Sequence, residues 1–258
     1  MLSSPDASTS DIVHRYCRFM NQSGHAVCRA TLALTTLHPQ MQALRYVWYD
    51  DVRDPGPVPS PALFRRTVSH PDGCTMDEAM MAFGARHTEA YKKSPFYQLQ
   101  LGTPKLSFLL TPGSKHDYSV LDDLAAMGAT HYLAYPLGVH EGQISLVTRH
   151  PGGFSDDDIA FIEQSLVCLS LLLTCAIKDL ILDTVLDCYI GHSPAGEVKR
   201  GNIRPGTMLD LRGAIWFSDI RGYSTHAQNH EPAVFIGKLN AYYEAVVTAS
   251  HAEGGEVL

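Results

Sequence analysis

The stretch 155–190 constrains the fold of this chain more than any other part of the sequence. Ser155 is a good helix N-cap, and the three aspartates at 156–158 favour the positive end of a helix dipole. No glycine or proline interrupts the sequence before Gly191. The sequence therefore predicts a single helix over 155–190, which is far longer than a typical helix of a globular protein.

Apolar residues of this helix recur at alternating intervals of three and four, which is the seam spacing of a coiled coil. They are Ile159, Ile162, Leu166, Leu169, Leu173, Ala176 and Leu180. This pattern predicts a signalling helix that pairs with a second copy in a homodimer. The alternative is a helix buried in its own domain. Because Leu171, Leu172 and Leu182 lie off the seam, we expect the helix to pack on its own domain and also to pair.

The residues before this helix show mixed periodicities and predict an α+β fold. Predicted helices cover 11–21, 76–91 and 121–127, and predicted strands cover 27–37, 44–49, 105–110, 131–137 and 143–148. The first two strands are expected to pair antiparallel, and so are the last two. Residues 1–10 are polar and predict a disordered tail, and the four prolines within 50–61 predict an exposed loop.

Composition places the chain among soluble globular proteins, with 45% hydrophobic and 18% charged residues. A net charge of −7 without a basic cluster gives no basis for nucleic-acid binding. The N-terminus lacks the pattern of a secretory signal, and the uncharged apolar run 165–177 is too short to cross a bilayer. Six scattered cysteines predict reduced thiols. We therefore expect a cytoplasmic protein without a membrane span.

A second informative pattern lies near the C-terminus. The apolar run 214–217 has strand propensity and ends at Asp219, and Gly222 marks a turn. A carboxylate at the end of a buried strand can hold a divalent cation, and the N–H groups of the next turn can face phosphate oxygens. Two-metal phosphoryl chemistry needs a second carboxylate, and none in a matching position follows before Leu258. The alternative is an aspartate that only caps the next helix.

Three segments occur in a characteristic order in this region. They are Phe217-Ser218-Asp219-Ile220-Arg221-Gly222-Tyr223-Ser224, Leu239-Asn240-Ala241-Tyr242-Tyr243 and Gly254-Gly255-Glu256-Val257-Leu258. This series resembles the opening of the catalytic domain of bacterial class III adenylate cyclases, which are nucleotidyl cyclases. The resemblance implies that 212–258 holds the first β-α elements of a ferredoxin-like catalytic domain, and that the remaining site residues would follow Leu258.

The same resemblance implies roles for individual residues. Asp219 and the Ile220 carbonyl would ligate Mg²⁺ or Mn²⁺, and the phosphates of ATP would lie near the backbone of Arg221, Gly222, Tyr223 and Ser224. The implied reaction converts ATP to cyclic AMP and pyrophosphate by two-metal-assisted attack of the ribose 3′-hydroxyl. ATP rather than GTP follows from the resemblance alone. Since most of the catalytic site would be missing, this chain by itself is expected to be inactive.

The N-terminal part is similar to GAF-like sensor domains found upstream of bacterial cyclases. The similar segments are Thr36-Leu37-His38-Pro39, Ser94-Pro95-Phe96-Tyr97, 128–137 and 154–158. This resemblance implies a disordered tail at 1–10, a sensor domain at 11–154, a signalling helix at 155–190, a linker at 191–211 and the catalytic fragment at 212–258. The signal would be an unknown small molecule. The alternative is a non-catalytic sensor and dimerisation module with a degenerate cyclase-like tail.

Aromatic residues are the sequence's candidates for the sensor pocket. They are Trp48, Phe96, Tyr97, Tyr118, Tyr132 and Tyr135, and ordinary packing is the alternative for each of them. A light or redox receptor is a third class of function. His70 and Cys74 are four residues apart, but no His/Cys set has the spacing of a closed zinc site, and no bilin attachment motif stands out.

Overall fold

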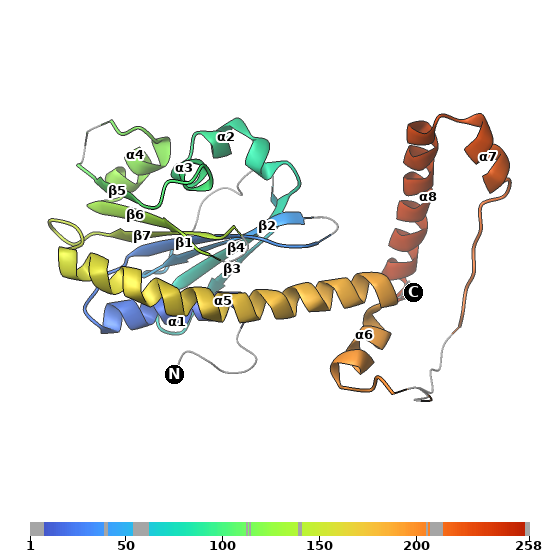
Figure 1. The fold of residues 1–258 in the computed structure, drawn as a ribbon, viewed down its shortest axis with the longest axis horizontal. Helices are drawn as coiled ribbons and strands as arrows, with labels where there is room; N and C mark the ends of the chain where they lie inside the picture. Colours follow the sequence, from blue (N-terminus) through green and yellow to red (C-terminus); the bar gives the residue numbers. More distant parts are fainter. Residues whose placement is uncertain are drawn as a thin grey trace. The chain divides into compact units, whose positions relative to one another are not determined.

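The computed structural model describes residues 8–38, 41–53, 62–111, 113, 115–138, 141–204, 206 and 214–255 (Figure 1). Within them the chain has an α+β fold, in which one antiparallel sheet is combined with helices. The chain divides into two compact units, Met1–Leu182 and Asp183–Leu258. The N-terminal unit contains the whole sheet, so any site built on the sheet belongs to that unit.

The sheet has seven strands within the described residues, and every neighbouring pair is antiparallel. The strands are β1 (Arg29–Thr35), β2 (Met41–Tyr49), β3 (Ala62–Ser69), β4 (Thr75–Ala82), β5 (Leu106–Leu109), β6 (His131–Pro136) and β7 (Gln143–Thr148). Their order across the sheet is β3-β4-β2-β1-β7-β6-β5. Strand β1 therefore pairs with β7, the last strand in the sequence, and this pairing joins the two halves of the sheet.

Helices cover both faces of the sheet (Figure 1). One face carries α1 (Thr9–Gln22) and α5 (Asp156–Ile190), and the other carries α2 (Glu89–Lys92), α3 (Pro95–Gln100) and α4 (Ser119–Ala126). A short 3₁₀ turn, η1 (Ala85–His87), precedes α2. The pairs of strands predicted at 27–37 with 44–49 and at 131–137 with 143–148 are confirmed as antiparallel neighbours, and the helix predicted at 121–127 corresponds to α4.

Strand β1 shows why the two faces of the sheet differ. Ala30, Leu32 and Leu34 are fully buried in the core formed with α1 and α5. The alternate residues Arg29 and Thr31 line a cavity on the opposite face. Because successive strand residues point to opposite faces, one strand supplies both the apolar core and a polar cavity wall.

Helix α1 begins earlier than the sequence predicts. The Ser8 hydroxyl accepts the Asp11 N–H at 3.2 Å, and the Asp11 carboxylate accepts the Ser8 N–H at 3.2 Å. This reciprocal capping box satisfies two backbone donors at the helix start. The prediction of a disordered tail over 1–10 is therefore wrong for residues 8–10, and residues 1–7 lie outside the described part of the chain.

Helix α5 starts and ends where the sequence predicts. The Ser155 hydroxyl accepts the Asp158 N–H at 3.1 Å, and the Asp158 carboxylate accepts the Ser155 N–H at 2.8 Å. Gly191 follows the last helical residue with a positive φ of 83°. A left-handed φ of this kind suits glycine, so the sequence contains both boundaries of the helix.

The predicted dimer seam of α5 faces the protein's own sheet. Ile162, Leu169 and Leu173 are at most 1% exposed in the core of the N-terminal unit, and Leu166 is 7% exposed. The remaining seam residues pack partly buried against the same core, and they are Ile159, Ala176 and Leu180. Because the core already covers Ile162, Leu166, Leu169 and Leu173, these four side chains do not face a partner helix, which differs from the prediction. Pairing of α5 with a second copy stays a prediction.

Helix α5 is the one helix among the described residues that is long and apolar enough to cross a membrane. The prediction of no membrane span considered only the run 165–177, and the helix extends well beyond that run. The side chains that α5 buries, such as Leu169 and Leu173, pack in the core of the sheet. The share of the most apolar 18-residue window of α5 that is buried is 22%.

The helix predicted at 76–91 is wrong. Its first half is strand β4, which pairs with β3 and β2, and only a 3₁₀ turn and the four-residue helix α2 follow it. Contacts with distant residues favour a strand here, because Asp77 forms an ion pair of 2.6 Å with Arg65 of β3 and Met76 is fully buried. Tertiary contacts of this strength override helix propensity. Strand β3 itself was not predicted, and residues 54–61 of the predicted loop lie outside the described residues.

The C-terminal unit contains helices and no sheet in its described residues. It begins with the end of α5, from Asp183 to Ile190, and its other helices are α6 (His192–Lys199), α7 (Tyr223–Asn229) and α8 (Pro232–Ala252). Helix α6 occupies part of the predicted linker, whose residues 205 and 207–211 are not described. The strand predicted at 214–217 does not form, and Ile215 and Phe217 are more than 80% exposed. A strand needs a hydrogen-bonding neighbour, and none lies beside 214–220 in the described part of the chain.

Candidate functional site

The best candidate for a binding site is a cavity of about 310 Å³ on the sheet face opposite α5. Its floor is formed by β1, β2 and β7, and its other wall by the segment from η1 to α3. A volume of this size lies at the lower end of the range for small-molecule sites in proteins. The site is therefore large enough for a small organic ligand.

Strand register places polar side chains together on the cavity floor. Thr31 of β1 lies directly opposite Ser145 of β7. Ala33 of β1 lies opposite Gln143 on one side and Arg45 of β2 on the other. Directly opposite residues share a face of the sheet, so these polar residues all point into the cavity.

The cavity carries a concentration of positive charge. Three arginines line it, Arg29, Arg45 and Arg86, and its described lining contains no aspartate or glutamate. Arg86 is neutralised at the rim, because it pairs with Glu141 and also donates to the Thr35 hydroxyl at 2.6 Å. Arg29 and Arg45 form no ion pair within the described residues. A chain with a net charge of −7 thus places two unneutralised cations at one cavity.

The surroundings of Arg45 explain its electrostatic state. Burial lowers the pKa of Arg45, and the nearby Arg29 lowers it further. Asp77 acts in the opposite direction, but its carboxylate is already paired with Arg65 at 2.6 Å. The Arg29 guanidinium lies over the Tyr49 ring at 5.6 Å from its centroid. Since guanidinium groups stay protonated in proteins, both charges persist in the cavity.

Hydrogen bonds fix the wall of the cavity to its floor. The Gln143 side-chain amide donates to the Phe96 carbonyl at 2.7 Å, and the Tyr91 hydroxyl donates to the Gln143 side-chain oxygen at 3.4 Å. Tyr132 is 3% exposed, and burial raises its pKa to about 12. Its hydroxyl is therefore neutral, and it is hydrogen-bonded to Ser145. Helix α3 and strand β7 thus hold a preformed cavity.

Two of the six predicted pocket aromatics, Phe96 and Tyr132, line this cavity. The other four do not. Trp48 and Tyr135 belong to the core on the α5 face of the sheet, Tyr97 packs edge-on against Tyr91, and Tyr118 packs edge-on against Phe108. Sequence reasoning selected aromatic residues and missed the arginines. The alternation of side chains along a strand would have placed Arg29 and Thr31 on one face of the sheet. It would also have placed Trp48 on the opposite face.

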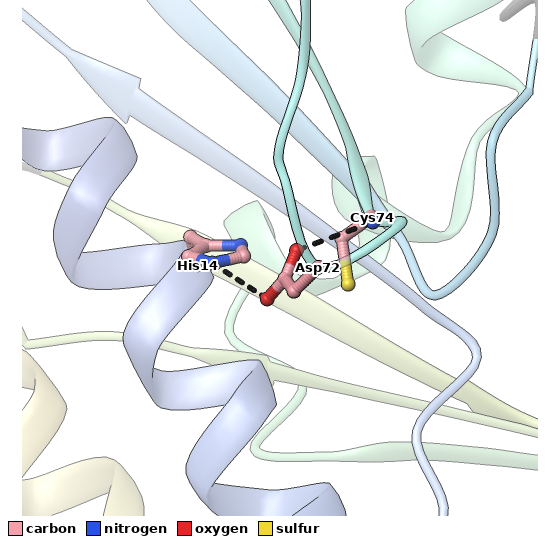
Figure 2. Close-up of side chains that lie close together, drawn as sticks. All are labelled: His14, Asp72 and Cys74. Atoms are coloured by element: carbon pink, nitrogen blue, oxygen red, sulfur yellow. Dashed lines mark hydrogen bonds and ion pairs between the residues drawn. The ribbon is translucent and has the colours of Figure 1, made fainter.

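A second cluster joins α1 to the turn between β3 and β4. Figure 2 shows His14 of α1 beside Asp72 and Cys74 of that turn. One ligand-type atom from each of the three lies within 4.8 Å of the others, and no further group of this kind occurs among the described residues. His70 stacks on His14, with ring centroids 3.8 Å apart and planes 7° from parallel. The sequence had paired His70 with Cys74 without finding His14.

The hydrogen bonds of this cluster oppose metal binding. The Trp48 indole N–H donates to His14 Nδ1 at 3.1 Å, so the neutral imidazole carries its proton on Nε2. That nitrogen lies 3.3 Å from Asp72, which also accepts from Arg18 at 3.0 Å. A metal at His14 Nε2 would have to displace this proton and approach a guanidinium. The cluster is thus a hydrogen-bond network that fastens α1 to the turn between β3 and β4, and Figure 2 shows the links from Asp72 to His14 and to Cys74.

Asp219 lies in an exposed, non-helical segment of the C-terminal unit. Its carboxylate accepts the backbone N–H of Ile220 at 2.8 Å, and the Ile220 carbonyl accepts the Tyr223 N–H at 3.3 Å. Gly222, with φ of 71°, caps helix α7. Carboxylate and carbonyl oxygens are ligand types that Mg²⁺ accepts, but two donors are fewer than its octahedral shell needs. The described residues do not complete a Mg²⁺ or Mn²⁺ site.

The predicted phosphate-binding residues also lie at the surface. Arg221, Gly222, Tyr223 and Ser224 are exposed at the start of α7. The Tyr223 ring packs edge-on against Phe235 of α8, with centroids 5.2 Å apart. These residues occupy adjoining positions on a turn and a helix start, as the sequence predicts, but no preformed phosphate cradle surrounds them within the described residues.

Helix α5 has a second apolar face that its own sheet does not cover. Val167, Leu171, Leu182, Val185 and Tyr189 are between 39% and 83% exposed. Val167 and Leu171 are four positions apart, and Leu182, Val185 and Tyr189 are three and four apart, with the exposed Lys178 and Asp179 between the two groups. By helical position both groups lie opposite the buried face of Leu169 and Leu173. The apolar positions that remain free for a partner are therefore on this outer face.

Comparison with known proteins gives no assignment. No protein-family model matches the chain, and no curated protein matches its sequence.

Proposed function

We propose that this chain is the sensor and dimerisation portion of a cytoplasmic adenylate cyclase, with a GAF-like ligand-binding domain in front of the first elements of a catalytic domain. The cavity on the sheet is the observation that carries the sensor role, because it is preformed and lined by unneutralised polar and charged groups. The order of elements, with an antiparallel sheet leading into one long helix, supports the GAF-like assignment.

The sheet offers a direct route from the cavity to helix α5. Thr31 and Arg29 of β1 line the cavity, and Leu32 and Leu34 of the same strand pack in the core that contains α5. A ligand that shifts β1 by a fraction of an ångström would change the packing under α5, since packed interiors transmit small displacements. The helix continues to Ile190, beyond the sensor domain, and would carry this change toward the catalytic segment.

The catalytic part of the proposal rests on the resemblance of 212–258 to class III cyclases. Asp219 and the Ile220 carbonyl would supply oxygen ligands for Mg²⁺ or Mn²⁺, and the backbone of 221–224 would face the phosphates of ATP. A bound metal would stabilise charge on the triphosphate. Because these residues alone do not complete a site, this chain is expected to form no cyclic AMP by itself.

Homodimer formation is part of the same proposal. The outer face of α5, with Leu171, Val185 and Tyr189, is apolar and exposed, and a second copy would bury it. Burial of such a stripe against its own copy gives a two-fold symmetric contact, which is the commonest symmetry of homodimers. The seam residues Leu169 and Leu173 contribute indirectly by holding α5 on the sheet.

A non-catalytic sensor and dimerisation module is the second candidate function. The exposed segment 214–220, which forms no strand, favours it, as does the capture of the Asp219 carboxylate by the neighbouring Ile220 N–H. Under this hypothesis the cyclase-like tail would be degenerate, and only ligand binding and pairing of copies would remain.

Cyclic AMP formation by the protein that the complete gene encodes separates the two candidates. The cyclase proposal expects Mg²⁺- or Mn²⁺-dependent activity that falls by at least about 100-fold in Asp219→Asn. Glu244→Gln is the matched control, since Glu244 is an exposed acid of α8 in the same unit. Activity that is absent in the wild type, or equal in Asp219→Asn, would leave only the non-catalytic module.

A further inference from the structure

We propose that the cavity on the sheet binds a small organic anion, whose carboxylate or phosphate group is held jointly by Arg29 and Arg45. This inference rests on the proposed role of the cavity as the sensor site and names the chemical class of its ligand. The remaining part of the ligand would be apolar and would lie against the wall formed by η1, α2 and α3.

The charge balance of the cavity gives the main argument. The guanidinium groups of Arg29 and Arg45 line the same cavity, and the described lining contains no carboxylate that would neutralise them. Placing like charges together in a partly buried site costs free energy. Asp77, the acid that acts on Arg45, is already paired with Arg65, and Glu141 is paired with Arg86. An anionic ligand is the partner that would neutralise this remaining charge.

The geometry of arginine strengthens the choice of anion. A guanidinium presents five N–H donors in a planar fork, which matches the two oxygens of a carboxylate or the oxygens of a phosphate. Ala33 and Arg45 are directly paired across β1 and β2, and Arg29 lies on the same face of β1. Since Arg29 is paired with Tyr49, the two arginines are four positions apart along this face, with Thr31 between them. Two guanidinium groups that extend toward each other over Thr31 can bind one anionic group from two sides.

Thr31 supplies an additional polar group between the two arginines. It is 8% exposed, and its hydroxyl has no hydrogen-bond partner within the described residues. A buried hydroxyl without a partner costs about 1–3 kcal/mol. A ligand oxygen within reach of Thr31 would give this hydroxyl its missing partner.

The rest of the cavity favours an apolar or aromatic ligand body. Met81, Phe96 and Val120 line it together with Tyr132. Aromatic rings and thioethers pack well against flat apolar groups. A cation would be repelled by the arginines, and a neutral ligand would leave their charges unbalanced. The ligand class is thus an anion with an apolar or aromatic body.

The test uses the whole chain and three probes of similar size. Benzoate and phenyl phosphate are the anionic probes, and benzamide is the neutral counterpart of benzoate. Titrations followed by protein NMR should show saturable binding of at least one anion, at least about tenfold tighter than benzamide. Arg45→Met and Arg29→Met should each weaken anion binding by at least about tenfold, and Arg45→Lys, which keeps the charge, should weaken it less.

Arg66→Met is the matched control. Arg66 lies on β3 and pairs with Glu78 at the surface, away from the cavity lining, so its replacement should leave anion binding unchanged. Thermal unfolding in the absence of probe confirms that each variant is folded. Equal affinity for benzamide and benzoate overturns the inference, as does wild-type binding by Arg45→Met and Arg29→Met. The absence of saturable binding of both anions up to about 20 mM also overturns it.

The outcomes separate this inference from the proposed cyclase function. If the anions bind through Arg29 and Arg45 but the complete protein forms no cyclic AMP, the cyclase function fails and the ligand class stands. If cyclic AMP forms in an Asp219-dependent reaction but neither anion binds, only the ligand class fails.

Discussion

Replacement of Leu173 by alanine is expected to destabilise the N-terminal unit strongly, because α5 packs on its own sheet. Leu173 is 0% exposed and lies in the core with α1 and the sheet. The change removes about three buried carbon atoms, worth about 0.8 kcal/mol each. The cavity left behind adds about 1–2 kcal/mol. The expected loss in the free energy of unfolding is therefore about 3.5–4.5 kcal/mol.

The matched control is Leu171→Ala on the same helix. Leu171 is 64% exposed, so its truncation should change the free energy of unfolding by about 0.5 kcal/mol or less. Urea unfolding can be followed through the fluorescence of Trp48, which is fully buried in this core. A Trp216→Phe background removes the other tryptophan, which is 67% exposed.

The experiment distinguishes the two roles that the sequence left open for this face of α5. If Leu173 contacted a partner helix, its truncation would change unfolding only in proportion to dimer formation, and the effect would depend on protein concentration. Packing on the sheet makes the effect independent of concentration over about a hundredfold range. Equal effects of Leu173→Ala and Leu171→Ala would refute the packing described here.

Three further predictions concern the sheet and the start of α5. Gly153→Ala should lower the melting temperature more than Gly152→Ala, since both have φ near 85° but only a Cβ at 153 would lie 2.7 Å from His131 Nδ1. Burial and, to a smaller extent, Lys105 lower the pKa of His131 below 6.5, so the unfolded state binds the proton first. The free energy of unfolding should therefore fall as the pH drops below about 6.5, and His131→Asn should reduce this slope in urea titrations at several pH values. Asp77→Ala should cost about 2–3 kcal/mol in urea unfolding, because it removes a charge-assisted hydrogen bond of 2.6 Å between side chains that are 2% and 12% exposed. A loss below about 1 kcal/mol would contradict this prediction. Equal melting temperatures for the two glycine variants, or an unchanged pH slope, would contradict the other two.

The parts of the fold that local signals determine were predictable. The boundaries of α5 follow from the Ser155 cap and from Gly191, both of which act within a few residues. The antiparallel pairs β1–β2 and β6–β7 follow from short apolar runs that are close together in the sequence. The prediction of a helix at 76–91 was wrong because β4 pairs with β2 and β3, and β3 was not predicted. Long-range pairing of this kind leaves little trace in local propensity.

The candidate site was predictable only in part. Phe96 and Tyr132 were expected in the pocket and line it. Arg29 and Arg45 lie on adjacent strands of one sheet face, and their proximity depends on the register between β1 and β2. Register is fixed by the pairing of whole strands, so composition and motif reasoning did not bring these residues together.

The sequence by itself determined the long helix, its two boundaries and the apolar periodicity of both its faces. Those features depend on interactions between residues a few positions apart. Only the tertiary structure decided which face of α5 the sheet covers and which cations meet in the cavity on the opposite side. The physical reason is that an apolar stripe is attracted equally to a sheet or to a second helix, and the strand register determines which surface is available to cover it.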